Sequence, residues 1–93
     1  MTIHRSEIYK AWIRTQPSIV SGRTPCEAHH EDILKSGGTG CKGHDCQCIP
    51  LTAEEHRERH QTGKDTFYNK YGIDPMLEII RHNARYMAEK GIK

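Results

Sequence analysis

The chain has 93 residues, of which 34% are hydrophobic and 28% are charged, and its formal net charge is +2. This length fits one domain and argues against a large multidomain enzyme. We expect neither a membrane protein nor a secreted disulfide-rich mini-protein, because no apolar run approaches the roughly 18 residues of a spanning helix and residues 1–12 lack the apolar core of a secretion signal.

The first predicted element is a helix over residues 5–15. Ile8, Trp12 and Ile13 fall on one face of this helix, and Pro17 ends it. The next stretch is rich in glycine and contains two short β-like segments, at 24–29 and 48–51. These segments predict a two-stranded ribbon with a long, loop-rich connection.

Two helices are expected directly after the second β-like segment. Thr52 and Glu55 form a capping box, which opens a helix over residues 53–63. The sequence EEHRERH within this helix is polar on every side, so its stability must come from capping, pairing or a ligand. A short helix over residues 64–71 follows and ends at Gly72.

The last predicted helix runs from Pro75 to about residue 90. Asp74 caps it, and proline is favoured at the first helical position. Four of its side chains form an apolar stripe: Leu77, Ile80, Ala84 and Met87. We treat residues 1–93 as a single domain, with a core at about 17–63 and helical flanks at 5–15 and 64–90.

Charge is distributed unevenly along the chain. Residues 1–25 carry four Lys or Arg and one Glu, residues 26–63 carry four Lys or Arg and seven Asp or Glu, and residues 64–93 carry six and four. The central segment also holds all four Cys and five of the seven His. This pattern suggests a metal site with cationic arms that meet a polyanion, and an ordinary solvated surface is the alternative.

Two pairs of histidines are candidate metal ligands. His56 and His60 are one helical turn apart, which places both imidazoles on one face, within reach of one ion. The alternative is two exposed histidines on a polar helix. His29 and His30 are adjacent at the end of the first β-like segment. They can serve one centre only at a strand end or in a strongly twisted ribbon, because regular alternation sends neighbours to opposite faces.

A longer pattern connects these residues. The stretch GRTPCEAHHEDILKSGGTGCKGHDCQCIPLTAEEHRERHQTG, residues 22–63, resembles the HNH (ββα-metal) nucleases of bacteriophages, especially the recombination-associated group. The resemblance rests on AHH, GGTG with a following lysine, an aspartate, Pro-Leu, H-x-x-x-H and a final glycine, in that order. The flanks AWIRTQP and FYNKYGID extend it to about residues 11–74.

The resemblance implies an α+β fold with a small ββα-metal core and a DNA endonuclease activity. In that family pattern His29, His56 and His60 bind one divalent cation, which would be Mg, Mn, Ni or Zn. His30 matches the general base that takes a proton from the attacking water, and Asp45 matches a residue that either orients this base or contacts the metal directly. The resemblance further implies a phage-encoded protein, active on DNA in the host cytoplasm. It leaves open a phage or host recombination or packaging protein as partner, and the oligomeric state.

The sequence departs from this family at its structural zinc site. Relatives usually carry a Cys-x-x-Cys knuckle after the first helix and a Cys after Pro-Leu, whereas residues 17–21 (PSIVS) and Thr52 stand at those places. The thiols occur elsewhere, with His44 among them. They leave open either a relocated structural zinc or four reduced thiols: Cys26, Cys41, Cys46 and Cys48.

The nearest cations to these motifs are candidates for phosphate contacts, and each is equally an ordinary surface residue: Lys35, Lys42, Arg57, Arg59 and Lys64. The alternative function is a non-catalytic, zinc-stapled nucleic-acid-binding phage protein, in which the histidines are structural. A closed site with four protein ligands would favour that binding module. Three protein ligands and an open position would favour the enzyme.

Overall fold

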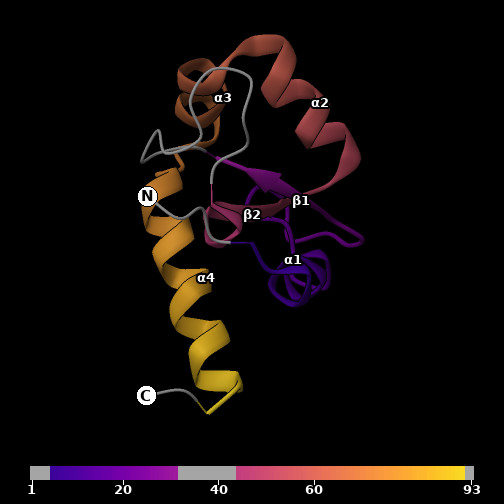
Figure 1. Ribbon diagram of the computed structural model, residues 1–93. Helices are drawn as coiled ribbons and strands as arrows, with labels where there is room; N and C mark the ends of the chain where they lie inside the picture. The colour runs from indigo at the N-terminus through magenta and orange to yellow at the C-terminus, as the bar shows by residue number, and fades with distance from the viewer. Residues whose placement is uncertain (1–4, 32–43, 92–93) are drawn as a thin grey trace.

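The computed structural model describes residues 5–31 and 44–91 and has a small α+β fold. Two antiparallel strands lie at its centre, with α1 on one side, α2 and α3 on the other, and α4 along one edge (Figure 1). The predicted α+β class is confirmed. In chain order the elements of the described residues are α1 (Glu7–Arg14), β1 (Glu27–His30), the 3-10 helix η1 (Asp45–Gln47), β2 (Cys48–Leu51), α2 (Ala53–Thr62), α3 (Lys64–Tyr71) and α4 (Pro75–Glu89).

The two strands form a short antiparallel ribbon. Glu27 lies opposite Leu51 at one end, and His30 lies opposite Cys48 at the other. The predicted second strand is confirmed as β2, whereas β1 begins three residues later than predicted. Pro25 has no backbone N–H to donate to a ladder, which agrees with a strand that starts beyond it.

The three helices predicted after β2 are confirmed. In the capping box of α2, the Thr52 hydroxyl accepts from the Glu55 N–H at 3.2 Å and the Glu55 carboxylate accepts from the Thr52 N–H at 2.9 Å. Gly72 ends α3 in the left-handed conformation, with φ 65°. The Asp74 carboxylate caps α4. Among residues 5–31 and 44–91, no helix is long and apolar enough to cross a membrane.

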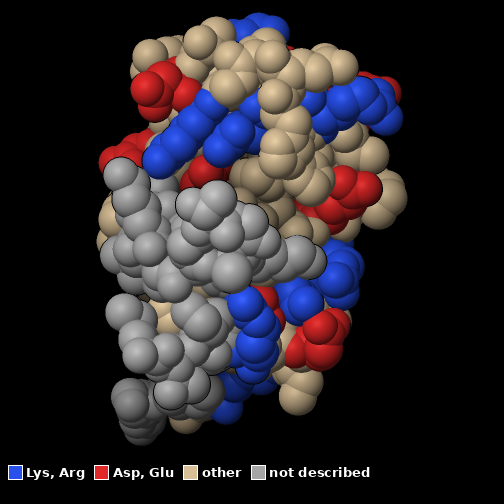
Figure 2. All heavy atoms as spheres, turned by 45° about the horizontal axis from the view of Figure 1, so that its top comes forward, with Lys and Arg blue, Asp and Glu red and all other residues tan. Residues whose placement is uncertain are grey.

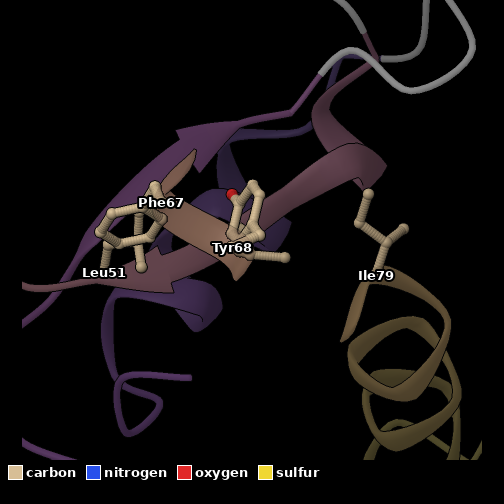
Figure 3. Packing of buried hydrophobic residues seen from close by; sticks show 5 residues of the cluster. Leu51, Phe67, Tyr68 and Ile79 are labelled. Atoms are coloured by element: carbon tan, nitrogen blue, oxygen red, sulfur yellow. The ribbon is translucent and has the colours of Figure 1, made fainter. Parts of the chain in front are cut away.

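The main hydrophobic cluster packs one face of β2 against α3 and α4. Ile49 and Leu51 contact Phe67, Tyr68 and Ile79, and all five are buried. Figure 3 shows the Phe67 ring beside Leu51, with Ile79 reaching toward the strands from α4. This cluster fixes α3 beside the sheet, so the residues of α3 lie within reach of the strand ends.

A second cluster packs the opposite face of β2 against α1. Cys48 contacts Tyr9 and Ile13, so β2 is buried along its whole length. The face predicted for α1 is partly wrong, because Ile8 is 69% exposed and Tyr9 is buried instead. The Tyr9 ring packs edge-on against Tyr86 of α4, with 4.9 Å between the ring centroids.

The apolar stripe predicted on α4 does not form its buried face. Leu77, Ile80 and Met87 are 41%, 56% and 44% exposed. Ile79 and His82 are buried instead, because β2 and α1 approach α4 from that side. The His82 ring N–H at Nδ1 donates to the Glu78 carbonyl at 2.7 Å, which satisfies its polar atom inside the helix.

Candidate metal centre

Three histidines from two elements meet at one place. His29 extends from β1 toward α2, and His56 and His60 extend from one face of α2 toward β1. One ring nitrogen of each lies within 4.8 Å of the others. The ring centroids are 4.7 Å apart for His29 and His56, 5.4 Å for His29 and His60, and 4.9 Å for His56 and His60. The structure thus brings together the three residues that the family resemblance implies as one ligand set.

Carboxylates bind one ring nitrogen of each of two of these histidines. His29 is buried, and its Nε2–H donates to Glu31 Oε2 at 3.0 Å. The Nδ1–H of His56 donates to Glu27 Oε1 at 2.7 Å. Burial lowers the pKa of His29, although the Glu31 carboxylate partly opposes this. A neutral imidazole with a carboxylate on its second nitrogen is the usual state of a metal-ligating histidine, so this donor set fits a divalent ion.

Glu31 is a buried carboxylate that the sequence analysis missed. Besides His29, it accepts from Arg59 at 3.0 and 2.8 Å and from the Tyr68 hydroxyl at 2.6 Å. Burial alone would raise the pKa of Glu31, but these hydrogen bonds outweigh it and hold the pKa well below its usual range. A glutamate directly after His-His was the only local signal, because its other partners lie 28 and 37 residues away.

His30 belongs to a second group, on the other face of the ribbon. Its Nε2–H donates to Asp45 Oδ1 at 2.8 Å, and Cys48 completes the group. Asp45 is also buried and accepts from the Ser6 N–H at 2.6 Å, with Lys10 at 3.9 Å. Burial would raise the pKa of Asp45, but the hydrogen bonds from His30 and Ser6 lower it below its ordinary value.

The second group differs from the first in its hydrogen-bond partners. Burial raises the pKa of the Cys48 thiol to about 12. The oxygens of Asp45 already accept from His30 and Ser6. The hydrogen bond from His30 to Asp45 orients the imidazole, which is the arrangement that the family resemblance implies for these two residues.

A shared hollow nevertheless joins the two groups. A cavity of about 250 Å³ is lined by Ala28, His29, His30, His56 and His60. His30 is the last residue of β1 and the one member of the second group among the residues that line this hollow. The sequence analysis predicted that His29 and His30 could serve one centre only at a strand end or in a strongly twisted ribbon. His30 lies at such a strand end.

The thiols that the structure describes do not assemble a zinc site. Cys26, Cys46 and Cys48 are free, and Cys41 lies outside the described residues. The register places Cys48 opposite His30, whereas Cys26 precedes the other end of β1, about 13 Å away along the strand at the usual rise per residue. Within residues 5–31 and 44–91, these three sulfurs belong to no common group of ligands.

Residues 18–23, where the family resemblance places the zinc knuckle, are joined to α2 by hydrogen bonds and an ion pair to one carboxylate. Glu55 of α2 is buried, and it accepts from the hydroxyl of Ser18 and from that of Ser21 at 2.6 Å. Burial would raise the pKa of Glu55, but these serine contacts lower it. Arg23 lies 3.8 Å from the same carboxylate. These contacts join residues 18–23 to α2 without a metal or a thiol.

The candidate DNA-contact residues differ in what they can reach. Arg57 is exposed and lines a hollow of about 260 Å³ beside His56 and His60, and Lys64 is exposed at the start of α3. The interpretation of Arg59 as a phosphate contact needs correction, because its guanidinium binds Glu31 and its side chain is only 15% exposed. Lys35 and Lys42 lie outside the described residues. On the face of the molecule that Figure 2 shows, the Lys and Arg side chains of the described residues are interspersed with Asp and Glu.

Comparison with known proteins gives one family. No curated protein and no solved structure matches the chain. One family model, described as "Protein of unknown function (DUF968)", matches residues 1–86, which is nearly the whole chain. The chain therefore belongs to the DUF968 family.

Proposed function

We propose that the protein is a metal-dependent endonuclease of the HNH (ββα-metal) type, which hydrolyses phosphodiester bonds in DNA. The observation that carries this proposal is the meeting of His29, His56 and His60 at one hollow, with His30 at its edge. His29 and His30 come from β1, His56 and His60 come from α2, and β2 lies between these two elements in the chain. This order agrees with the strand–strand–helix arrangement that the sequence resemblance implies.

The number of ligands favours an enzyme over a zinc-stapled binding module. In the described residues the group contains three histidines and no further Cys, Asp or Glu within the same reach. Three protein ligands leave a position open, which is typical of a catalytic site, whereas structural sites are closed by four. A divalent cation held by these histidines supplies positive charge beside the phosphate oxygens, where negative charge grows as the bond breaks.

His30 is the general base in this proposal. Its Nε2–H donates to Asp45, which leaves Nδ1 as the nitrogen that accepts a proton from water. The water oxygen bonds to phosphorus as His30 takes the proton of that water, the bond to the 3′ oxygen breaks, and the leaving 3′ oxygen takes a proton from solvent water. Asp45 keeps the ring oriented and stabilises the imidazolium that forms. The expected products are a 5′-phosphate and a 3′-hydroxyl.

Plasmid cleavage tests the proposal directly. Purified protein is incubated with supercoiled plasmid and Mg²⁺, Mn²⁺, Ni²⁺ or Zn²⁺, with an EDTA control. We expect nicking that requires an ion and that disappears in EDTA. Nicking that is unchanged in the His30→Ala and His56→Ala variants would identify a contaminant and remove the proposal.

A further inference from the structure

The carboxylate of Glu31 lies behind the metal centre and outside its ligand set. Glu31 is 3% exposed and is not among the histidine group, so it does not compete with His29 for an ion. It accepts four hydrogen bonds, from one nitrogen of His29, two nitrogens of Arg59 and the hydroxyl of Tyr68. These donors come from β1, α2 and α3, so three elements converge on one carboxylate.

The contact with Glu31 decides which nitrogen of His29 is free. An ionised carboxylate only accepts hydrogen bonds, so the nitrogen that faces it, Nε2, must carry the hydrogen. A neutral imidazole has one hydrogen, and therefore Nδ1 has the free lone pair. Because Nε2 is occupied by Glu31, Nδ1 is the nitrogen of His29 that remains for an ion shared with His56 and His60.

Glu31 is itself held in place from two sides. Arg59 donates to both of its oxygens, and Arg59 precedes the ligand His60 on α2. Tyr68 donates from α3, where the main hydrophobic cluster fixes its ring. The rotamer of His29 is therefore coupled to the packing of α3 through Glu31, which lies outside the group of three histidines.

We propose that Glu31 is the positioning residue of the metal centre, which holds His29 with Nδ1 toward His56 and His60, and that Arg59 and Tyr68 act on the affinity for the ion through it. This inference rests on the metal centre of the proposed function, but it does not depend on DNA cleavage. It explains why a half-buried arginine, a buried carboxylate and a buried tyrosine contact His29, the most buried of the three histidines, directly or through Glu31.

The test compares Glu31→Gln with Glu55→Gln. Both remove a buried carboxylate that accepts several hydrogen bonds, but Glu55 contacts serines and Thr52 and none of the three histidines. Affinity for Zn²⁺ and for Ni²⁺ is measured by competition with a chelator on the folded proteins. We expect Glu31→Gln to bind about 10–100-fold more weakly, because one amide oxygen replaces two charged ones. We expect Glu55→Gln to remain near wild type.

Ring-nitrogen NMR of the wild type gives a second readout that needs no variant. In the metal-free protein His29 should carry its hydrogen on Nε2, which leaves Nδ1 as the nitrogen available to an ion. A hydrogen on Nδ1, or equal affinities of Glu31→Gln and Glu55→Gln, would overturn the inference while leaving the nuclease intact. A wild type that binds the ions but does not cut DNA removes the nuclease and leaves the inference standing. A wild type that binds neither ion overturns the metal centre and this inference together.

Discussion

The histidine groups on the two faces of the ribbon contain similar residues and differ in their chemistry. His29 and His30 are neighbours, yet His29 joins His56 and His60 whereas His30 joins Asp45 and Cys48. In the first group, carboxylates bind one ring nitrogen of His29 and one of His56. In the second, the carboxylate accepts from His30 and from the Ser6 N–H, and burial raises the pKa of the thiol. The residue types alone therefore do not distinguish the two groups, whereas their hydrogen-bond partners do.

The largest expected effect separates the two groups by function. His30→Ala should lower the cleavage rate by about 10²–10⁴, the usual cost of losing a general base, and should keep its metal. His56→Ala should lose metal and cleavage together. Metal content by elemental analysis and nicking rate, measured on the same preparations, distinguish the two variants. If His30→Ala loses metal as fully as His56→Ala, His30 is a ligand and the division between the groups fails.

Chelation should destabilise the protein only through the first group. An ion present at 100 times its dissociation constant stabilises the folded state by about 2.7 kcal/mol. We therefore expect EDTA to lower the melting temperature of the wild type and to leave that of His60→Ala unchanged. Thermal unfolding with Zn²⁺ and with EDTA measures the difference. Equal responses of the two proteins would place the ion elsewhere.

A smaller effect is expected from the arginine beside the first group. Arg57 lines the hollow next to His56 and His60, so Arg57→Ala should reduce the slope of log affinity for DNA against log salt by about 1. Binding titrations at several salt concentrations measure this slope. Arg81→Ala is the matched control, because Arg81 is an exposed arginine on α4 paired with Glu78. The same slope in all three proteins would argue against a phosphate contact at Arg57.

The smallest effect concerns a histidine that belongs to neither group. Burial lowers the pKa of His82, although the Glu78 carbonyl partly opposes this. The unfolded chain then binds a proton more readily than the folded one, so stability from His82 is complete above about pH 6.5 and is lost as the pH falls through the folded pKa. Urea unfolding of wild type and His82→Gln between pH 5 and 8 checks this. The difference between them should narrow toward low pH, and a constant difference would contradict the assignment.

The local elements were predictable because each carries its signal in a few neighbouring residues. The capping box of Thr52 and Glu55, and Asp74 before Pro75, were read correctly as helix starts. The spacing of His56 and His60 likewise predicted a common face, which the structure confirms.

The buried faces and the support of the centre depended on contacts distant in sequence. On α1, the helical pattern allowed either Ile8 or Tyr9 to lie inward. Tyr9 is the buried residue because its ring packs against Tyr86 of α4. Glu31 looked like any charged residue after a strand, because Tyr68 lies 37 residues away. Periodicity cannot reveal a carboxylate whose partners come from other elements.

The serine network around Glu55 has a consequence for the redox behaviour of the fold. Where the resemblance places a zinc knuckle, the join between residues 18–23 and α2 consists of hydroxyls and a carboxylate. Hydroxyl and carboxylate groups are not converted to sulfenic acids or disulfides by peroxide, and their hydrogen bonds require no zinc. This join should therefore survive both oxidative stress and metal starvation, conditions that would open a thiolate knuckle in the same place.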